Sequence, residues 1–101
     1  LLHPLIEWCQ ANASKVQGCY IPVPSDRHTQ VFVVGASPFY DFTLGEDIAD
    51  LELRFFDAGW PSVNVLQLPA SATEVLQTYF DTRGALEVYA QLTRAPRQGE
   101  P

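Results

Sequence analysis

Residues 30–69 constrain the fold more than any other part of this chain. They predict, in order, an apolar strand, an aromatic loop, a helix with clear start and stop signals, and a second apolar strand. A strand, a helix and a strand joined by short links predict a right-handed parallel crossover within one sheet. The loop after the first strand then lies at the edge where such sheets commonly bind ligands.

The helix of this unit is predicted over residues 44–58. Thr43 and Glu46 have the spacing of a capping box, in which each side chain bonds a free amide at the helix start. Gly59 suits the left-handed residue that ends many helices, and Pro61 prevents continuation. One apolar stripe is expected to face the core, and it consists of Leu44, Ile48, Leu51, Phe55 and Ala58.

The N-terminal part of the chain predicts a helix and a hairpin. The helix is expected over 4–13, where a proline occupies the first position. A short strand follows over 19–23, and Pro22 suggests a sheet edge because proline has no N–H to donate. The next strand, over 29–34, completes the hairpin, and its run of VFVV suits burial on both faces.

The C-terminal part adds a strand over 62–68 and a capped helix over 72–80. Residues 85–92 fit a strand by alternation and a helix by composition, and the Ala, Leu, Glu and Gln content favours a helix. The fold class is then α+β, a small three-stranded mixed sheet with helices packed on it, in the order α-β-β-α-β-α-(α). We expect one domain over 1–94 and a flexible tail over 95–101.

Charge and hydropathy argue against two classes of partner. The 101 residues include six Lys or Arg and twelve Asp or Glu, which gives a net charge of −6. Nucleic acid is not an expected partner, because binding a phosphate backbone requires clustered basic side chains. A membrane is not expected either, since no apolar run approaches the roughly 20 residues that cross a bilayer.

The cysteines and histidines do not predict a metal site. Cys9 and Cys19 form no CxxC pattern, and with His3 and His28 they match no zinc spacing. Two free thiols suit a reducing compartment, so we expect a cytoplasmic protein, although a bridge between them stays open. No metal and no cofactor are predicted. The chain begins with Leu1, and we expect it to be a processed or excised piece.

One pair of acidic residues has the spacing of a known catalytic motif. Gly35-Ala36 follows a predicted strand, and Asp50-Leu51-Glu52-Leu53 comes later. This arrangement resembles nucleotidyltransferases of the polymerase-β type, which carry a Gly-[Gly/Ser] followed by alternating carboxylates on a strand. The resemblance implies that Asp50 and Glu52 hold metal ions against a triphosphate, with both side chains on one side of the strand.

The same acidic residues also belong to the predicted helix. On a helix, Asp50 and Glu52 point to different sides, and a solvated surface is then the expected role. Ala36 stands where the family has Gly or Ser, and Asn64 stands near the position of its third carboxylate. We therefore expect no catalytic residues and keep a metal- or nucleotide-binding enzyme domain that uses Asp50 and Glu52 as the alternative.

The loop over 35–42 is the first of two candidate binding surfaces. It carries Phe39, Tyr40, Asp41 and Phe42, and rigid aromatic side chains are common at binding hot spots. These residues predict either a site for a small ligand or a partner, or packing against the start of the helix.

The second candidate is another apolar face of the main helix. Leu53 and Phe56 project away from the core stripe, and Trp60 follows the end of the helix. They are covered by another part of the chain or form an interface. The sequence therefore favours a non-catalytic protein-interaction module, which binds another protein or a second copy of itself as a homodimer.

Overall fold

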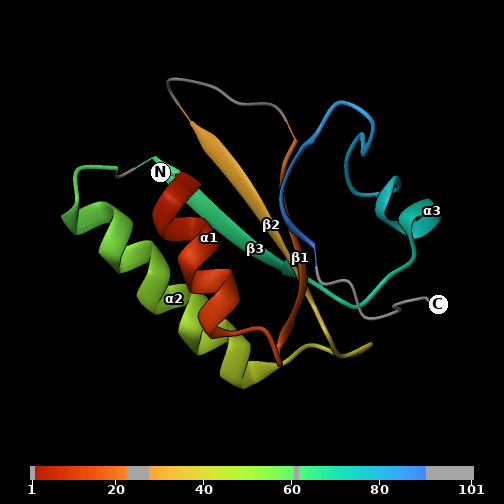
Figure 1. The fold of residues 1–101 in the computed structure, drawn as a ribbon, viewed down its shortest axis with the longest axis horizontal. Helices are drawn as coiled ribbons and strands as arrows, with labels where there is room; N and C mark the ends of the chain where they lie inside the picture. Colours follow the sequence, from red (N-terminus) through yellow and green to blue (C-terminus); the bar gives the residue numbers. More distant parts are fainter. Residues whose placement is uncertain (1, 23–27, 61, 91–101) are drawn as a thin grey trace, which may run out of the picture.

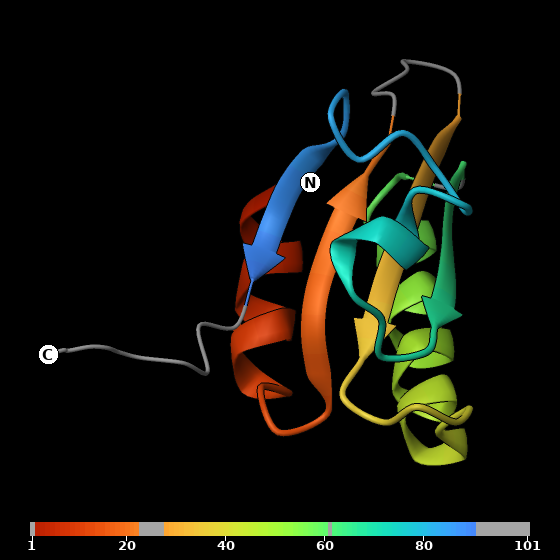
Figure 2. The same cartoon turned by 90° about the vertical axis from the view of Figure 1, so that its right-hand side faces the viewer.

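The computed structural model describes residues 2–22, 28–60 and 62–90. The helices α1 and α2 cover one face of the sheet, and α3 with its adjoining loops lies against the other, which gives three layers (Figures 1 and 2). The elements in chain order are α1 (Leu2–Ala11), β1 (Val16–Ile21), β2 (Thr29–Gly35), α2 (Phe42–Asp57), β3 (Val63–Leu68), α3 (Thr73–Leu76) and β4 (Leu86–Ala90).

The sheet has four strands in the order β3-β2-β1-β4. β1 pairs antiparallel with β2 and with β4, and β2 pairs parallel with β3. The mixed α+β architecture, the hairpin and the parallel crossover are therefore confirmed. The prediction of three strands is wrong, because Leu86–Ala90 pairs with β1 instead of forming a helix. Helix propensity differs among ordinary residues by less than about 1 kcal/mol, and ladder hydrogen bonds override such a preference.

The position predicted for the first strand is also wrong. β1 lies inside the sheet between β2 and β4, and Pro22 comes directly after its last residue, Ile21. The proline therefore ends the strand and removes no ladder hydrogen bond. Residues 23–27, which follow Pro22, and the predicted tail, 95–101, lie outside the described residues.

The main core lies between the sheet and the pair α1 and α2. Val31 and Val33 of β2 are fully buried, and Val34 is buried on the opposite face, as the VFVV run predicts. From α2, the predicted core residues are buried with the exception of Ala58, which is the exposed C-cap. The α2 side chains in this core are Leu44, Ile48, Leu51 and Phe55.

A smaller core lies on the opposite face of the sheet. Phe80 stacks on Phe32 at a centroid distance of 5.0 Å and also contacts Tyr20 at 5.4 Å. The predicted helix over 72–80 is shorter in the structure, where α3 covers Thr73–Leu76 and turns follow it. Leu76 and Phe80 nevertheless reach the sheet, so this segment covers part of its second face.

Asp41 begins α2. Its carboxylate accepts the Leu44 amide at 3.1 Å, and its extended backbone places Phe42 as the first helical residue. The predicted capping box of Thr43 and Glu46 is therefore wrong, because both residues lie within the helix. An aspartate at this position bonds a free amide and complements the positive end of the helix dipole.

No helix in the described part of the chain is long and apolar enough to cross a membrane.

Candidate functional site

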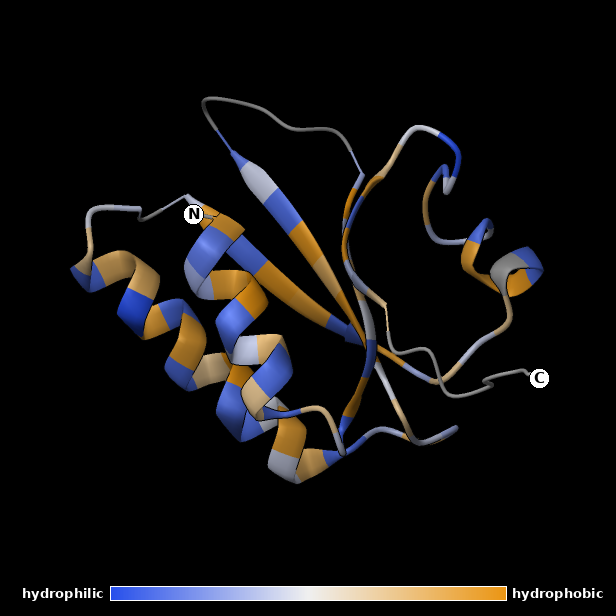
Figure 3. Ribbon diagram, viewed as in Figure 1, coloured by the Kyte–Doolittle hydropathy of each residue, from blue (hydrophilic) through white to orange (hydrophobic). Residues whose placement is uncertain are grey.

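One side of α2 carries large apolar groups that the domain leaves exposed. Phe42 is 78% exposed, and Leu53 and Phe56 are each 62% exposed. With Ala49 these residues lie within about 60° of one another around the helix at 100° per residue, and they point away from the buried stripe. We call this set, Phe42, Ala49, Leu53 and Phe56, the outer face of α2. Apolar segments recur along the whole of α2 in Figure 3.

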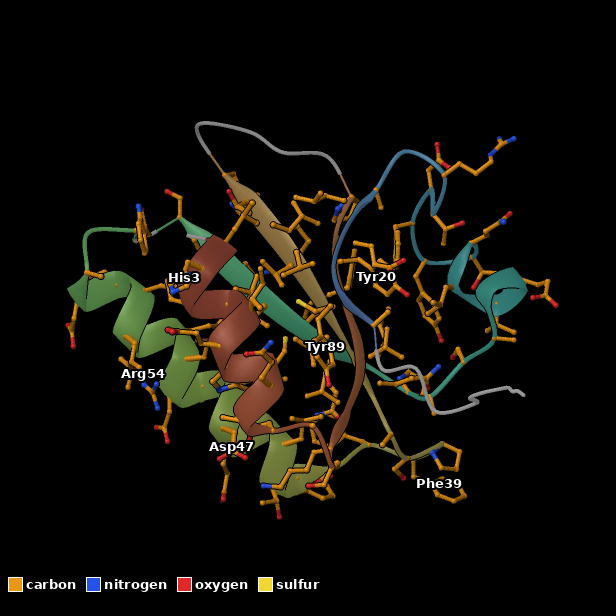
Figure 4. The ribbon with its side chains drawn as sticks, viewed as in Figure 1. His3, Tyr20, Phe39, Asp47, Arg54 and Tyr89 are labelled. Atoms are coloured by element: carbon orange, nitrogen blue, oxygen red, sulfur yellow. The ribbon has the colours of Figure 1, made fainter. Side chains whose placement is uncertain are left out.

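The aromatic loop extends this surface at one end. The ring of Tyr40 packs edge-on against Phe42 at a centroid distance of 4.9 Å. The Tyr40 hydroxyl lies over Gly45, where any side chain would collide with it. Phe39, 77% exposed, stands at the tip of the loop away from α1 and α2 (Figure 4). The loop thus places Tyr40 beside the outer face and Phe39 apart from it.

Asp41 holds the loop to both α2 and β3 by hydrogen bonds. In addition to its cap on Leu44, its amide donates to the side-chain carbonyl of Gln67 at 2.8 Å. Its own carbonyl accepts from the Gln67 side-chain amide at 3.0 Å. This paired contact joins β3 to the start of α2 and fixes where Tyr40 and Phe42 lie. No sequence pattern identified Gln67, since the contact joins residues far apart in the chain.

Several amides of the loop are bonded within the domain. The Ala36 amide donates to the Lys15 carbonyl at 2.9 Å, and the Phe39 amide donates to the Ser37 hydroxyl oxygen at 3.1 Å. Phosphate-binding loops present free backbone amides to the anion, and these two amides and that of Asp41 already have acceptors. The loop is therefore built for a fixed shape and an exposed aromatic tip.

Trp60 closes the C-terminal end of α2. Its amide donates to the Phe55 carbonyl at 2.7 Å, and the Gly59 amide donates to Phe56 at 3.1 Å. Gly59 has a φ of 97°, which completes a Schellman motif. The Trp60 ring packs on Phe55 at 5.8 Å, as this motif favours, and remains 39% exposed at the end of the helix.

The two acidic residues of the sequence motif do not meet. Glu52 accepts the Val65 amide at 2.8 Å and so bonds the outer edge of β3. Asp50 is exposed and lines a groove between α1 and α2. Both lie on a helix, where residues two apart point to different sides. β3 itself has the sequence VNVLQL and carries no carboxylate.

The groove between α1 and α2 is a feature that sequence reasoning missed. It holds about 400 Å³, and Trp8 and Asp50 line it together with Arg54. Lys15 donates to Asp47 at 2.9 Å beside it, and this hydrogen bond raises the pKa of Lys15. No group of three potential ligands capable of holding a metal is found among the described residues. The helical periodicity of charges alone could not show which faces of α1 and α2 meet.

Cys9 and Cys19 lie in the main core as free, buried thiols. Their hydrogen bond, together with burial, raises the pKa of Cys19 well above its usual value. The Cys19 thiol is therefore protonated at neutral pH, which makes it a poor nucleophile and a poor metal ligand.

Comparison with known proteins finds the fold in toxin–antitoxin complexes. One matching chain comes from the tri-AMPylated HEPN toxin of Shewanella oneidensis in complex with MNT antitoxin, with a TM-score of 0.57 and 18% identity over 89% of this chain and 70% of that chain. Another comes from a mutant of the toxin–antitoxin pair MntA-HpeT, with a TM-score of 0.58 and 17% identity over 90% of this chain and 74% of that chain. At this identity the similarity shows a common fold. No family model matches the sequence, and a search of curated proteins found no match.

Proposed function

We propose that this chain is a nucleotidyltransferase-like domain that binds a partner protein through the outer face of α2. The observation that carries the proposal is the exposure of Phe42, Leu53 and Phe56 on one side of a single helix. Large apolar groups gathered on a surface mark interaction sites more often than scattered ones do. The fold likeness supports the same proposal, because both similar chains belong to complexes of two proteins.

The geometry also suits contact with a helix or a flat surface. α2 has 16 residues, so its outer face extends over about 24 Å at 1.5 Å per residue. Tyr40 and Phe42 lie at one end and Phe56 near the other, which gives two aromatic anchors along one line. Tyr and Phe bury large areas with few rotatable bonds, and their contacts dominate many interfaces.

Site-specific photo-crosslinking tests this proposal. A photoreactive amino acid at residue 53 should capture a partner in cells, whereas the same group at residue 75 should not. Val75 is a matched control, because it is 47% exposed and lies on α3, on the opposite side of the sheet. Capture that is equal at the two positions, or absent at residue 53, would contradict binding through α2.

Nucleotidyl transfer is the second candidate, and the fold likeness is the observation that favours it. The toxin in one of the similar complexes is tri-AMPylated, so AMP has been attached to that protein. In such a reaction an acceptor hydroxyl bonds the α-phosphorus of ATP and pyrophosphate leaves, and metal ions held by carboxylates normally stabilise the charge. Asp50 and Glu52 would have to supply these carboxylates from different sides of α2.

Labelled ATP separates the two candidates. With Mg²⁺ and ATP labelled at the α-phosphate, an enzyme should transfer label to itself or to the crosslinked partner. The Asp50→Asn and Glu52→Gln variants should then lose that transfer. Transfer that persists in both variants would exclude these residues as metal ligands, and a complete lack of transfer would leave partner binding as the function.

Binding of a small ligand by the loop over 35–42 is the remaining alternative, and it can be tested at Tyr40. Tyr40→Ala should abolish such binding without loss of stability. The internal bonding of the loop amides favours a role for Tyr40 in protein contact instead.

A further inference from the structure

Carboxylates border the outer face of α2. Glu46, Asp50 and Asp57 are exposed and follow one side of it, at about 50–90° from its centre at 100° per residue. None of these three forms an ion pair within the described residues. Arg54 is the basic residue of α2, and it lines the groove toward α1 together with Asp50.

The other border is acidic as well. Glu52 lies there, half-buried, with its carboxylate on the Val65 amide. The outer face of α2 thus has three exposed carboxylates along one side and the β3-bonded carboxylate of Glu52 on the other. A partner that covers the strip must place its own flanking residues close to these carboxylates.

A second copy of this chain does not fit that requirement. If two α2 helices pack antiparallel through their outer faces, residues of the same border meet across the pair. In the register that places Glu46 of one copy opposite Asp57 of the other, carboxylates of the same border face each other. Like charges placed against each other oppose association, and the net charge of −6 per chain adds to the repulsion.

We propose that the outer face of α2 takes a basic amphipathic helix of a different protein. Apolar side chains of that helix lie on Leu53 and Phe56, and its Lys or Arg residues lie opposite Glu46, Asp50 and Asp57. This inference rests on the proposed function, that α2 binds a protein, and adds the chemistry of the partner. Recognition follows the helix-on-helix mode, with apolar anchors at the centre and charges that select the partner.

Two designed peptides test it. Both are helical, about 18 residues long to match α2 at 1.5 Å per residue, with identical leucine positions. One carries Lys at the flanking positions and the other carries Glu. Each is titrated into the ¹⁵N-labelled chain. The Leu/Lys peptide should bind at least about tenfold more tightly, since three exposed charge pairs each contribute modestly. Amide shifts should concentrate on Leu53 and Phe56.

Two sets of variants distinguish the contribution of the carboxylates to peptide binding from that of the apolar contact. Leu53→Asp should lose binding of the Leu/Lys peptide, whereas the matched control Val75→Asp should keep it. The triple variant Glu46→Gln, Asp50→Asn, Asp57→Asn should bind both peptides with similar affinity. Raising the salt concentration should weaken the Leu/Lys complex of the unmodified chain and leave that of the triple variant nearly unchanged.

The outcomes distinguish this inference from the proposed function. Equal affinity for the two peptides, or binding of neither, overturns the basic helix as the partner. The crosslinking at residue 53 decides separately whether α2 binds another kind of protein. A dimer of the unmodified chain in sedimentation that dissociates on Leu53→Asp identifies a second copy as the partner, and it also overturns the inference.

Discussion

The inner and outer faces of α2 contain the same kinds of residue and lie in opposite environments. Phe55 is 2% exposed and Phe56 is 62% exposed, although they are neighbours in sequence. Leu51 is 2% exposed and Leu53 is 62% exposed. A step of 100° per residue separates them, so one set reaches the sheet and the other reaches solvent. Position on the helix, and not hydrophobicity alone, therefore decides which of these side chains the domain covers.

The largest expected effect comes from truncating the inner face. Phe55→Ala should lower the free energy of unfolding by about 3–5 kcal/mol, because it removes a buried ring and leaves a cavity. Phe56→Ala should change it by less than about 0.5 kcal/mol, since the ring is exposed. Urea denaturation followed by circular dichroism measures both. Equal losses for the two variants would show that the domain covers its outer face.

Substitution of Glu52, at the border between the two faces, should have an intermediate effect on the free energy of unfolding. Glu52→Leu should cost about 1–2 kcal/mol, because the Val65 amide loses a charged acceptor. Asp50→Asn on the same helix is the control, with an expected change below about 0.5 kcal/mol, because Asp50 is exposed and forms no ion pair among the described residues. Faster hydrogen exchange at the Val65 amide in the Glu52 variant would locate the lost bond. Unchanged exchange there would mean that Glu52 does not hold this strand edge.

Loss of the N-cap residue of α2 should have a smaller effect on the free energy of unfolding. Asp41→Ala should cost about 1 kcal/mol through loss of the N-cap, and Asp41→Asn should keep most of the stability. Thr43→Ala should be nearly neutral, because Thr43 lies within α2 and Asp41 bonds the Leu44 amide. Thermal denaturation measures these losses. A larger loss of stability for Thr43→Ala than for Asp41→Ala would indicate that Thr43 caps the helix, as the sequence suggests.

The smallest effect on stability is expected on the outer face itself. Leu53→Asp should change the free energy of unfolding by less than about 0.5 kcal/mol, since a charge at an exposed site remains hydrated. The same substitution should abolish partner binding. A large loss of stability would instead indicate that Leu53 is covered in the folded chain, and the comparison of the two faces would then fail.

Local signals in the sequence predicted much of the central unit. The strand at Val31 to Val34, the helix around Ile48 and the stop at Gly59 depend on neighbours within a few residues, and all three are present. The fourth strand could not be predicted in this way. Residues 86–90 are ambiguous by local preference, and their pairing with β1 joins residues about 70 positions apart.

The surface was predicted less completely than the core. The sequence singled out Leu53 and Phe56 correctly as residues that the core stripe excludes, because helical periodicity places them by geometry. It could not show that Tyr40 lies on Phe42, or that Gln67 holds Asp41, since both depend on how the loop and β3 come together.

The sequence by itself determined the α2 helix, its two apolar faces and the parallel crossover around it, because periodicity, helix-ending residues and short links act over a few residues. The tertiary structure decided which residue caps α2, where Glu52 and Asp50 point, and that four strands form the sheet. These features depend on contacts between distant segments, and the free energy of such contacts exceeds the weak local preferences that sequence reasoning uses.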